Sequence, residues 1–338
     1  MIKHCCQMDI ETRSSLIIKL FLISLFLGPS LCFGDETSST LVYSSNTLGE
    51  IDPSWRGQTG YAGGLARRSH YIKKAREEVK NLLVLDGGDA LVNPYFNDEQ
   101  EKPKAMKRAE AMSEAYEKMG YDAINMGDFD LALGIKYLRY LQRRSNIPFI
   151  SANLVYSGTD KNVFKPYLIR KIGGLKVGII GLLPSELPIH MYEELRGYSI
   201  KDPFQTAISV MSYLTTRCDY LIALAHLTHP EIESLVDIFP GISIIIGGEN
   251  RSFLFPKEVF GSLVVQTDAF GIHIGRLNLK LTKRPSDHFD VFPTTLLQKN
   301  IAGYENVMTL FHPGMGSDPE IEELISASRD QLKRPLPW

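Results

Sequence analysis

The sequence contains little cysteine and carries almost no excess charge of either sign. Only four of its 338 residues are cysteine, and the formal net charge is −2. A chain with so small a net charge lacks the bulk positive charge that favours nucleic acid, so no nucleic-acid partner is expected. Its 44% content of apolar residues excludes a disordered chain and is enough for a sizeable core.

An export signal is predicted at the N-terminus. Residues 16–27 form a mostly apolar run after Arg13, and Gly34 offers a small side chain for cleavage. Because this run is too short to span a bilayer, we predict that residues 1–34 are a signal peptide. The mature protein is then periplasmic or secreted and has no membrane span; an uncleaved anchor is the alternative. Cleavage would remove three of the four cysteines and leave Cys218 as a free thiol.

Short β-branched runs alternate with helical stretches from residue 40 onward, which is the pattern of a layered α/β fold. Several runs are apolar at consecutive positions, so their strands are expected to be covered on both faces. Strands are predicted at residues 40–44, 82–86, 123–125, 149–150, 176–181, 220–225, 242–246, 262–266 and 275–281. Helices are predicted at residues 64–80, 104–119, 135–144, 203–217 and 318–332. The pairs Arg67-Arg68 and Arg143-Arg144 are expected on solvated helix faces.

The predicted elements suggest one large domain followed by a short extension. We predict an α/β domain over residues 35–285 and a C-terminal extension over residues 286–338. Asp318 is a good N-cap and Pro319 suits the first helical position, so the extension is expected to contain one short helix.

Polar side chains of three chemical kinds follow successive predicted strands. The residues just beyond these strands are Asn46, Asp89, Asp128, His226 and Glu249. Ligands gather at the carboxyl ends of strands in an α/β sheet, and carboxylate, amide and imidazole groups are donors for a divalent metal. Taken singly, each has a plainer explanation as a turn residue, a helix cap or a buried histidine. The prediction of a metal site therefore rests on their order along the chain.

The order of these motifs resembles that of the calcineurin-like metallophosphoesterase superfamily, and within it the N-terminal domain of secreted 5'-nucleotidases. Residues 85–89 (Leu-Asp-Gly-Gly-Asp) are similar to the block whose aspartate bridges two metals in that family. Residues 120–130 fall where the family has Gly-Tyr-Asp-Ala and then Gly-Asn-His-Glu. The resemblance covers residues 40–281 and implies a four-layer α/β/β/α sandwich. Residues 47–68 look more like a bacterial exported subgroup.

The sequence departs from the family pattern at most of the metal-binding positions. Only Asp89 and His226 keep the residue of the family. The substituted positions are Asn46 and Leu48 for the first-strand aspartate and histidine, Asp128 for the asparagine, Phe129 for the general-acid histidine, and Glu249 and Arg251 for the histidine pair. The resemblance then implies that Asp89, Asp128 and His226 act as metal ligands, with Asn46 and Glu249 as further oxygen ligands.

These substitutions change the chemistry that is expected. Oxygen donors favour a hard ion such as Mg²⁺, Mn²⁺ or Ca²⁺ over Zn²⁺, and the site is also compatible with no metal at all. Loss of a general acid costs typically 10²- to 10⁴-fold in rate. Asp128 and Asp130 are the candidate catalytic residues, and Asp130 or His229 would have to replace the missing acid, although the Pro after His229 also suits the start of a helix.

Two further residues are candidates for binding an anion. Arg251 and Asn250 lie beside Glu249 after an apolar strand. A guanidinium there would clamp a phosphate ester or another anion, or it would form a structural ion pair with Glu249 or Asp128.

Two functions follow from the resemblance. The first is a 5'-nucleotidase-like phosphoesterase with weakened or lost metal-dependent activity. The second is a non-catalytic pseudoenzyme that binds a ligand or an envelope partner, which the sequence does not identify. A redox or envelope-assembly accessory is a third, weaker reading. Because the chain stops at the predicted C-terminal helix, no second, substrate-binding domain is expected.

Overall fold

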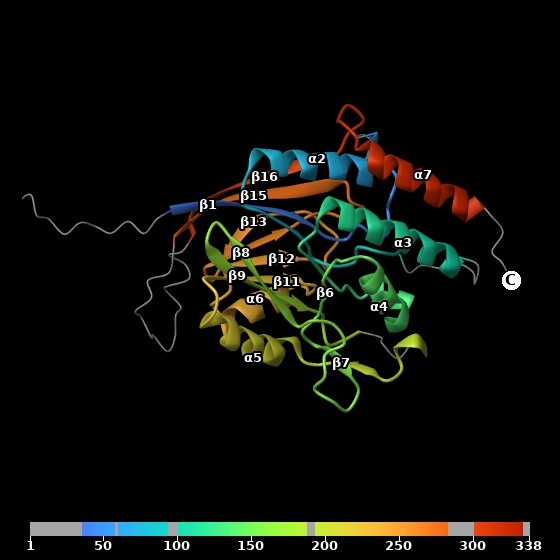
Figure 1. The fold of residues 1–338 in the computed structure, drawn as a ribbon. Helices are drawn as coiled ribbons and strands as arrows, with labels where there is room; N and C mark the ends of the chain where they lie inside the picture. Colours follow the sequence, from blue (N-terminus) through green and yellow to red (C-terminus); the bar gives the residue numbers. More distant parts are fainter. Residues whose placement is uncertain (1–35, 58–59, 94–100, 188–192, 283–300, 334–338) are drawn as a thin grey trace, which may run out of the picture. The chain divides into compact units, whose positions relative to one another are not determined.

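The computed structural model describes residues 36–57, 60–93, 101–187, 193–282 and 301–333, and Figure 1 shows their arrangement. The predicted signal peptide lies outside the described residues. The chain from Glu36 onward forms one unit. No helix among the described residues is long and apolar enough to cross a bilayer.

The first sheet has six strands in the order β16-β15-β1-β4-β5-β6. Its strands are β1 (Glu36–Ser44), β4 (Leu82–Asp86), β5 (Ala123–Asn125), β6 (Phe149–Ile150), β15 (His273–Thr282) and β16 (Ile301–Leu310). The first four are parallel, so their carboxyl ends meet at one edge. The helices of its outer layer are α2 (Leu65–Glu78), α3 (Glu101–Met119), α4 (Ile135–Arg144) and α7 (Pro319–Lys333) (Figure 1).

The second sheet also has six strands, in the order β13-β14-β12-β11-β9-β8. Its strands are β8 (Tyr167–Ile172), β9 (Leu175–Leu182), β11 (Tyr220–Ala225), β12 (Ile244–Gly247), β13 (Leu254–Val259) and β14 (Ser262–Gln266). Four of them, β9, β11, β12 and β14, are parallel. The helices α5 (Pro203–Thr215) and α6 (His229–Ile238) cover its outer face.

Smaller elements complete the described structure. Two short antiparallel pairs join β2 (Ser54–Trp55) to β3 (Tyr61–Ala62) and β7 (Leu154–Tyr156) to β10 (Tyr198–Ile200). Two 3₁₀ helices are η2 (Asp130–Leu133) and η4 (Glu193–Leu195).

Three apolar layers hold the elements together. In β1, Leu41 and Tyr43 belong to the layer between the two sheets, whereas Val42 belongs to the layer under the outer helices. This division follows from the two-residue period of a strand. The third layer lies between the second sheet and α5 and α6. The protein is therefore a four-layer α/β/β/α sandwich, and the fold class predicted from the sequence is confirmed.

Several elements escaped the sequence analysis. The strands β8, β13 and β16 lie at sheet edges, and helix α6 is short. In β16 every residue is exposed or half-buried, so no continuous apolar run marks the strand. This strand pairs with β15 over most of its length. The stretch after residue 285 therefore supplies a strand of the first sheet as well as the C-terminal helix α7.

Two expectations about single side chains have opposite outcomes. Cys218 is a free thiol, as expected, and it is buried. The expectation that Arg67 and Arg68 lie on a solvated helix face is wrong for Arg68, which is only 1% exposed. Arg143 and Arg144 are exposed, as expected.

Candidate metal centre

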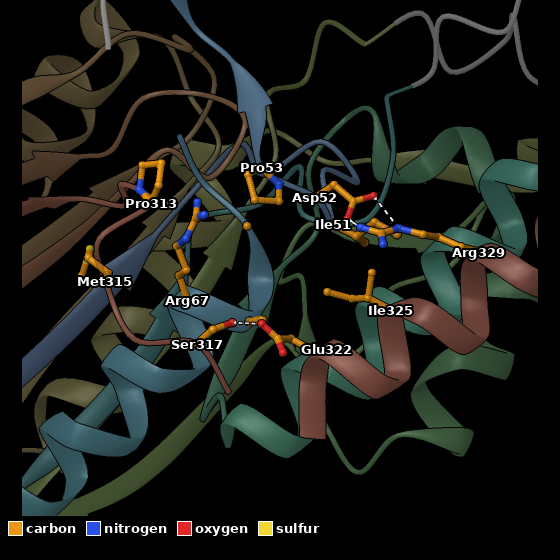
Figure 2. A pocket seen from close by; sticks show the side chains of 12 residues that line it. Ile51, Asp52, Pro53, Arg67, Pro313, Met315, Ser317, Glu322, Ile325 and Arg329 are labelled. Carbon is orange, nitrogen blue, oxygen red and sulfur yellow. Dashed lines mark hydrogen bonds and ion pairs between the residues drawn. The ribbon is translucent and has the colours of Figure 1, made fainter. Parts of the chain in front are cut away.

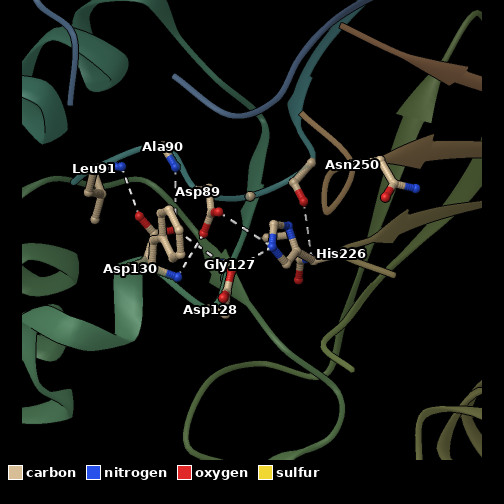
Figure 3. Close-up of polar contacts among 12 residues, drawn as sticks. Asp89, Ala90, Leu91, Gly127, Asp128, Asp130, His226 and Asn250 are labelled. Atoms are coloured by element: carbon tan, nitrogen blue, oxygen red, sulfur yellow. Dashed lines mark hydrogen bonds and ion pairs between the residues drawn. The ribbon is translucent and has the colours of Figure 1, made fainter. Parts of the chain in front are cut away.

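Three side chains from two sheets converge where their strands end. Asp89 follows β4, Asp128 follows β5 and His226 follows β11. One ligand atom of each lies within 4.8 Å of the others, as Figure 3 shows. The His226 Nε2 atom lies 2.9 Å from Asp128 Oδ1 and 3.5 Å from Asp89 Oδ2. The sequence analysis predicted that these three residues share one site, and the fold brings them together.

The loop that carries Asp89 is fixed against the loop that carries Asp128. The backbone N–H of Phe129 donates to Asp89 Oδ1 over 2.9 Å. Gly127 passes so close that a Cβ atom there would overlap the Asp89 carboxylate. Asp89 itself has a φ of 54°, a left-handed conformation that is uncommon for a residue other than glycine. The position of the carboxylate is therefore set by both loops.

Two glycines make room for the imidazole. A Cβ atom on Gly248 would lie 2.6 Å from His226 Nδ1, and one on Gly88 would lie 3.2 Å from the same atom. His226 is only 1% exposed. The Gly-Gly pairs after β4 and β12 are thus needed for the close approach of the two sheets around this ring. The sequence showed these glycines, but only the fold shows what they contact.

In the cluster, the charges of two carboxylates act on one imidazole. Burial lowers the pKa of His226, but the charges of Asp89 and Asp128 outweigh this effect and raise it to about 9. Burial raises the pKa of Asp89 well above its ordinary value, although the charge of His226 opposes the rise. For Asp128 the burial effect is outweighed by the hydrogen bond and charge of His226, so its pKa is lowered. The two carboxylates therefore favour a positive charge on the imidazole between them.

The donor set fits a divalent cation. Asp89 Oδ2 is buried and has no hydrogen-bond partner among the described residues, and the same is true of both amide atoms of Asn46. Buried polar atoms without partners are rare and require an explanation, such as an absent ion or water. Asn46 lies on the adjoining loop, where its N–H donates to Gly88 O over 2.9 Å. Two carboxylates and an imidazole are suitable ligands for a divalent metal.

Glu249 and Asn250, which were predicted to belong to this site, lie beside the cluster. Among the described residues, Glu249 does not join the group formed by Asp89, Asp128 and His226. With its amide oriented to satisfy both neighbours, Asn250 donates to Glu249 Oε2 over 2.8 Å and accepts from His229 N over 3.1 Å. The two residues thus join the end of β12 to the start of α6.

Arg251 contacts an aromatic ring and no carboxylate. Its guanidinium lies 3.9 Å from the centroid of the Phe129 ring. Among the contacts of the described residues it forms no ion pair with Glu249 or Asp128, so the ion-pair alternative is not what the structure shows. Its charge nevertheless contributes to the lowered pKa of Asp128. Two of the positions that the resemblance matches to family histidines, 129 and 251, are therefore in contact with each other here.

Asp130 supports the loops and does not join the cluster. Its carboxylate accepts hydrogen bonds from the N–H groups of Leu91 over 2.8 Å and Gly127 over 3.1 Å, with a longer one from Ala90 (Figure 3). Burial raises its pKa to about 6 against these hydrogen bonds. The geometry favours a structural role. His229 begins helix α6, as its sequence context suggested, and its buried Nε2 atom has no partner among the described residues.

A separate pocket of about 480 Å³ lies between the start of α2 and helix α7 (Figure 2). Most polar side chains at its wall pair with one another, Arg329 with Asp52 and Ser317 with Glu322 over 2.5 Å, while Arg67 donates to the carbonyl oxygen of Gly63 over 2.9 Å. None of the three cluster residues lines this pocket. It contains no buried polar group that calls for a ligand.

Comparisons with known proteins place the fold in a family context. No protein-family model matches the chain. The chain is 29% identical over 299 residues to a 5'-nucleotidase of Vibrio cholerae, an alignment that covers 77% of this chain and 52% of that protein. It spans between 33% and 52% of the length of four curated relatives, two of them 5'-nucleotidases and two 2',3'-cyclic-nucleotide 2'-phosphodiesterase/3'-nucleotidases.

Solved structures show the same fold. The 5'-nucleotidase precursor from Thermus thermophilus superposes with a TM-score of 0.71 and 23% identity, covering 88% of this chain and 59% of that one. The calcineurin-like phosphoesterase YfkN from Bacillus subtilis has a TM-score of 0.70 and 18% identity, covering 88% and 98%. The chain is therefore a homologue of 5'-nucleotidases and has the calcineurin-like phosphoesterase fold.

Proposed function

We propose that this protein is an exported, 5'-nucleotidase-like phosphoesterase that binds a single divalent cation and has weak hydrolytic activity. The observation that carries the proposal is the convergence of Asp89, Asp128 and His226 within 4.8 Å. The buried Asp89 Oδ2 atom, which accepts no hydrogen bond among the described residues and has His226 Nε2 at 3.5 Å, supports it. Because two of the three ligands are carboxylates, we expect Mg²⁺, Mn²⁺ or Ca²⁺ to be preferred over Zn²⁺.

The residues around the cluster argue for one cation and against two. At the family's second position this chain has Leu48, which is buried and has no donor atom, and Arg251, whose charge opposes a second cation. Asn46 is the remaining oxygen donor on that side. When bound, a divalent ion would polarise a phosphoryl oxygen and lower the pKa of a water molecule.

The chain's own residues then have limited parts to play. Arg251, held by Phe129 and next to Asp128, offers a guanidinium to the phosphate of an ester or to another anion, whereas the amide of Asn250 is engaged by Glu249 and His229. Phe129 has no proton to give to a leaving group. Asp130 is held by backbone N–H groups, so His229 is the better of the two candidate replacements. Because Phe129 stands where the family has its proton donor, we expect weak turnover.

A non-catalytic role is the second candidate, and one observation favours it. The Arg251–Phe129 stack occupies two positions that the resemblance matches to family histidines, Phe129 to the general acid and Arg251 to one of the metal-binding pair. A protein with this arrangement would still bind an anion or an envelope partner at the strand ends without hydrolysing it. The proposed export by residues 1–34 is compatible with both candidates.

The test is metal binding measured together with turnover. The full chain would be expressed, the exported form purified and stripped of metal, and Mg²⁺, Mn²⁺, Ca²⁺ and Zn²⁺ titrated separately by calorimetry. Turnover of bis(p-nitrophenyl) phosphate and of nucleoside monophosphates would be measured with each ion. Asp89→Asn is the site variant, and Asp160→Asn, at an exposed carboxylate paired with Lys201, is the matched control.

We expect one ion per chain in the wild type and in Asp160→Asn, and none in Asp89→Asn. Slow turnover that disappears in Asp89→Asn would support the enzyme and exclude the non-catalytic candidate. Bound metal without turnover would favour the non-catalytic candidate. The proposal is refuted if none of the four ions binds, or if two ions bind per chain.

A further inference from the structure

A buried arginine lies behind the candidate metal centre. Arg68, on helix α2, is only 1% exposed. Its Nη1 atom donates to Thr47 Oγ1 over 3.0 Å and to the Tyr116 hydroxyl over 2.8 Å. A Cβ atom on Gly271 would overlap the guanidinium, so the backbone there must be glycine to admit it. None of the contacts described for the metal cluster involves this side chain.

The hydrogen bonds continue from Arg68 to the strand end that carries the Asp-Gly-Gly-Asp block. The Tyr116 hydroxyl donates to Asp86 Oδ2 over 3.1 Å, and Ser44 Oγ donates to the same atom over 2.6 Å. Asp86 Oδ1 accepts from the N–H of Gly88 over 3.0 Å. Helix α2, helix α3, the end of β1 and the loop after β4 are thus joined in one buried network.

The network also balances two buried charges. Asp86 is fully buried, and Tyr116 bridges it to Arg68. Burial of either charge without an opposite charge would be costly. Burial lowers the pKa of Arg68, but Tyr116, Tyr121 and Asp86 outweigh it and raise the pKa. Arg68 therefore stays charged, and removing its charge would leave Asp86 without compensation.

This network ends on two loops with unfavourable backbone conformations. Thr47 lies between Asn46 and Leu48, whose φ values are 54° and 56°, and Asp89 has a φ of 54°. Left-handed conformations are uncommon for residues other than glycine, least so for Asn and Asp, and they persist only where the surroundings hold them. The loops are joined by hydrogen bonds from Asn46 N to Gly88 O and from Leu48 N to Asp89 O. Arg68 holds the first loop through Thr47, and Asp86 holds the second through Gly88.

We propose that Arg68 is a positioning residue for the metal centre: through Thr47, Tyr116 and Asp86 it keeps the loops 44–48 and 86–89 in the strained conformation that presents Asp89 to the cluster. The inference rests on the proposed function only for the identity of the ligand of Asp89, a divalent cation. The positioning itself is a property of the metal-free loops and is measurable without metal.

The experiment compares four forms of the exported full chain: wild type, Arg68→Met, Tyr116→Phe and Leu214→Ala. Arg68→Met keeps much of the side-chain length but removes the charge and all donors, whereas Tyr116→Phe removes one hydroxyl. Leu214, in α5 against the second sheet, is fully buried and far from the network in the layered fold, so it controls for lost stability alone. Hydrogen–deuterium exchange of residues 44–49 and 86–90 is read in the absence of metal, and Mn²⁺ affinity by calorimetry.

We expect the amides of Asn46 and Leu48 to lose protection in Arg68→Met and Tyr116→Phe but not in Leu214→Ala. The Kd for Mn²⁺ should rise about tenfold in both network variants, while Leu214→Ala lowers only the melting temperature. Unchanged loop exchange in both network variants would overturn the inference, as would equal loss in Leu214→Ala. If wild type binds none of Mg²⁺, Mn²⁺, Ca²⁺ and Zn²⁺, the proposed function fails, and the loop exchange still decides the positioning. If Arg68→Met does not fold, Tyr116→Phe gives the same decision.

Discussion

The substitution Gly248→Ala tests whether the metal centre depends on the close approach of the two sheets. A Cβ atom at this position would lie 2.6 Å from His226 Nδ1 and 2.7 Å from the carbonyl oxygen of Gly87, whereas real Cβ contacts are essentially never below 3.0 Å. The imidazole is buried and the other contact is backbone, so neither can move aside freely. The loops after β4 and β12 must therefore separate by about 0.4 Å, the difference between 2.6 and 3.0 Å.

Overpacking of this kind typically costs about 1–3 kcal/mol. In a domain of this size each kcal/mol lowers the melting temperature by roughly 2–4 °C, so we expect a fall of about 2–12 °C. Ligand positions at a binding site must hold to within about 0.5 Å. A separation of about 0.4 Å uses most of this tolerance. We therefore expect the Kd for Mn²⁺ to rise about tenfold.

The assay pairs Gly248→Ala with Gly303→Ala. Gly303 lies in the edge strand β16, and a Cβ atom there would have no neighbour within 4 Å. Differential scanning fluorimetry gives the melting temperatures, and calorimetry gives the Mn²⁺ affinities. Gly303→Ala should match wild type in both. If Gly248→Ala also matches wild type, the two loops can separate without cost, and the reasoning that glycines build the centre is wrong.

Three further outcomes are expected from single side chains. Burial raises the pKa of the Cys218 thiol, so the native exported protein should react with DTNB far more slowly than the urea-unfolded protein at the same pH. Asp130→Ala should lower the free energy of unfolding by roughly 1–3 kcal/mol for each N–H left unpaired, with Leu91 the best-bonded of them, as measured by urea titration. Burial raises the pKa of Asp318, but hydrogen bonds from Lys73 and Ser69 outweigh it, so the net pKa is lowered. The carboxylate then stabilises the fold above its ordinary pKa of 3.8 and ceases to do so as the pH falls through its lower folded value. The difference in melting temperature between wild type and Asp318→Asn should therefore shrink on acidification below about pH 4, and a difference that grows instead would contradict this sign.

The central strands and most helices could be predicted because their apolar runs are long enough to mark them. The strands Tyr220–Ala225 and Ser262–Gln266 have the predicted bounds, since every residue in them is buried. Edge strands lack such continuous apolar runs. In β16 no residue is fully buried, so no continuous apolar run predicts a strand there.

The candidate site was predictable to the extent that strand ends determine it. Asp89, Asp128 and His226 each follow a parallel strand, and the parallel arrangement makes those ends meet. The partners of other residues depend on distant segments. Arg68 shares its sequence context with half-buried Arg67, and only the packing of α2 on α3 places it beside Tyr116. No local pattern distinguishes such an arginine from a solvated one.

The structure separates what holds the centre from what would make it reactive. Asp89 is held by the N–H of Phe129, a backbone group that any side chain at position 129 would supply. The ring of Phe129 contacts the guanidinium of Arg251 and takes no part in this hydrogen bond. Replacing a histidine by phenylalanine at this position therefore removes a proton donor without loosening the carboxylate. For this physical reason, a cation site for one metal and weak hydrolysis are compatible in the same protein.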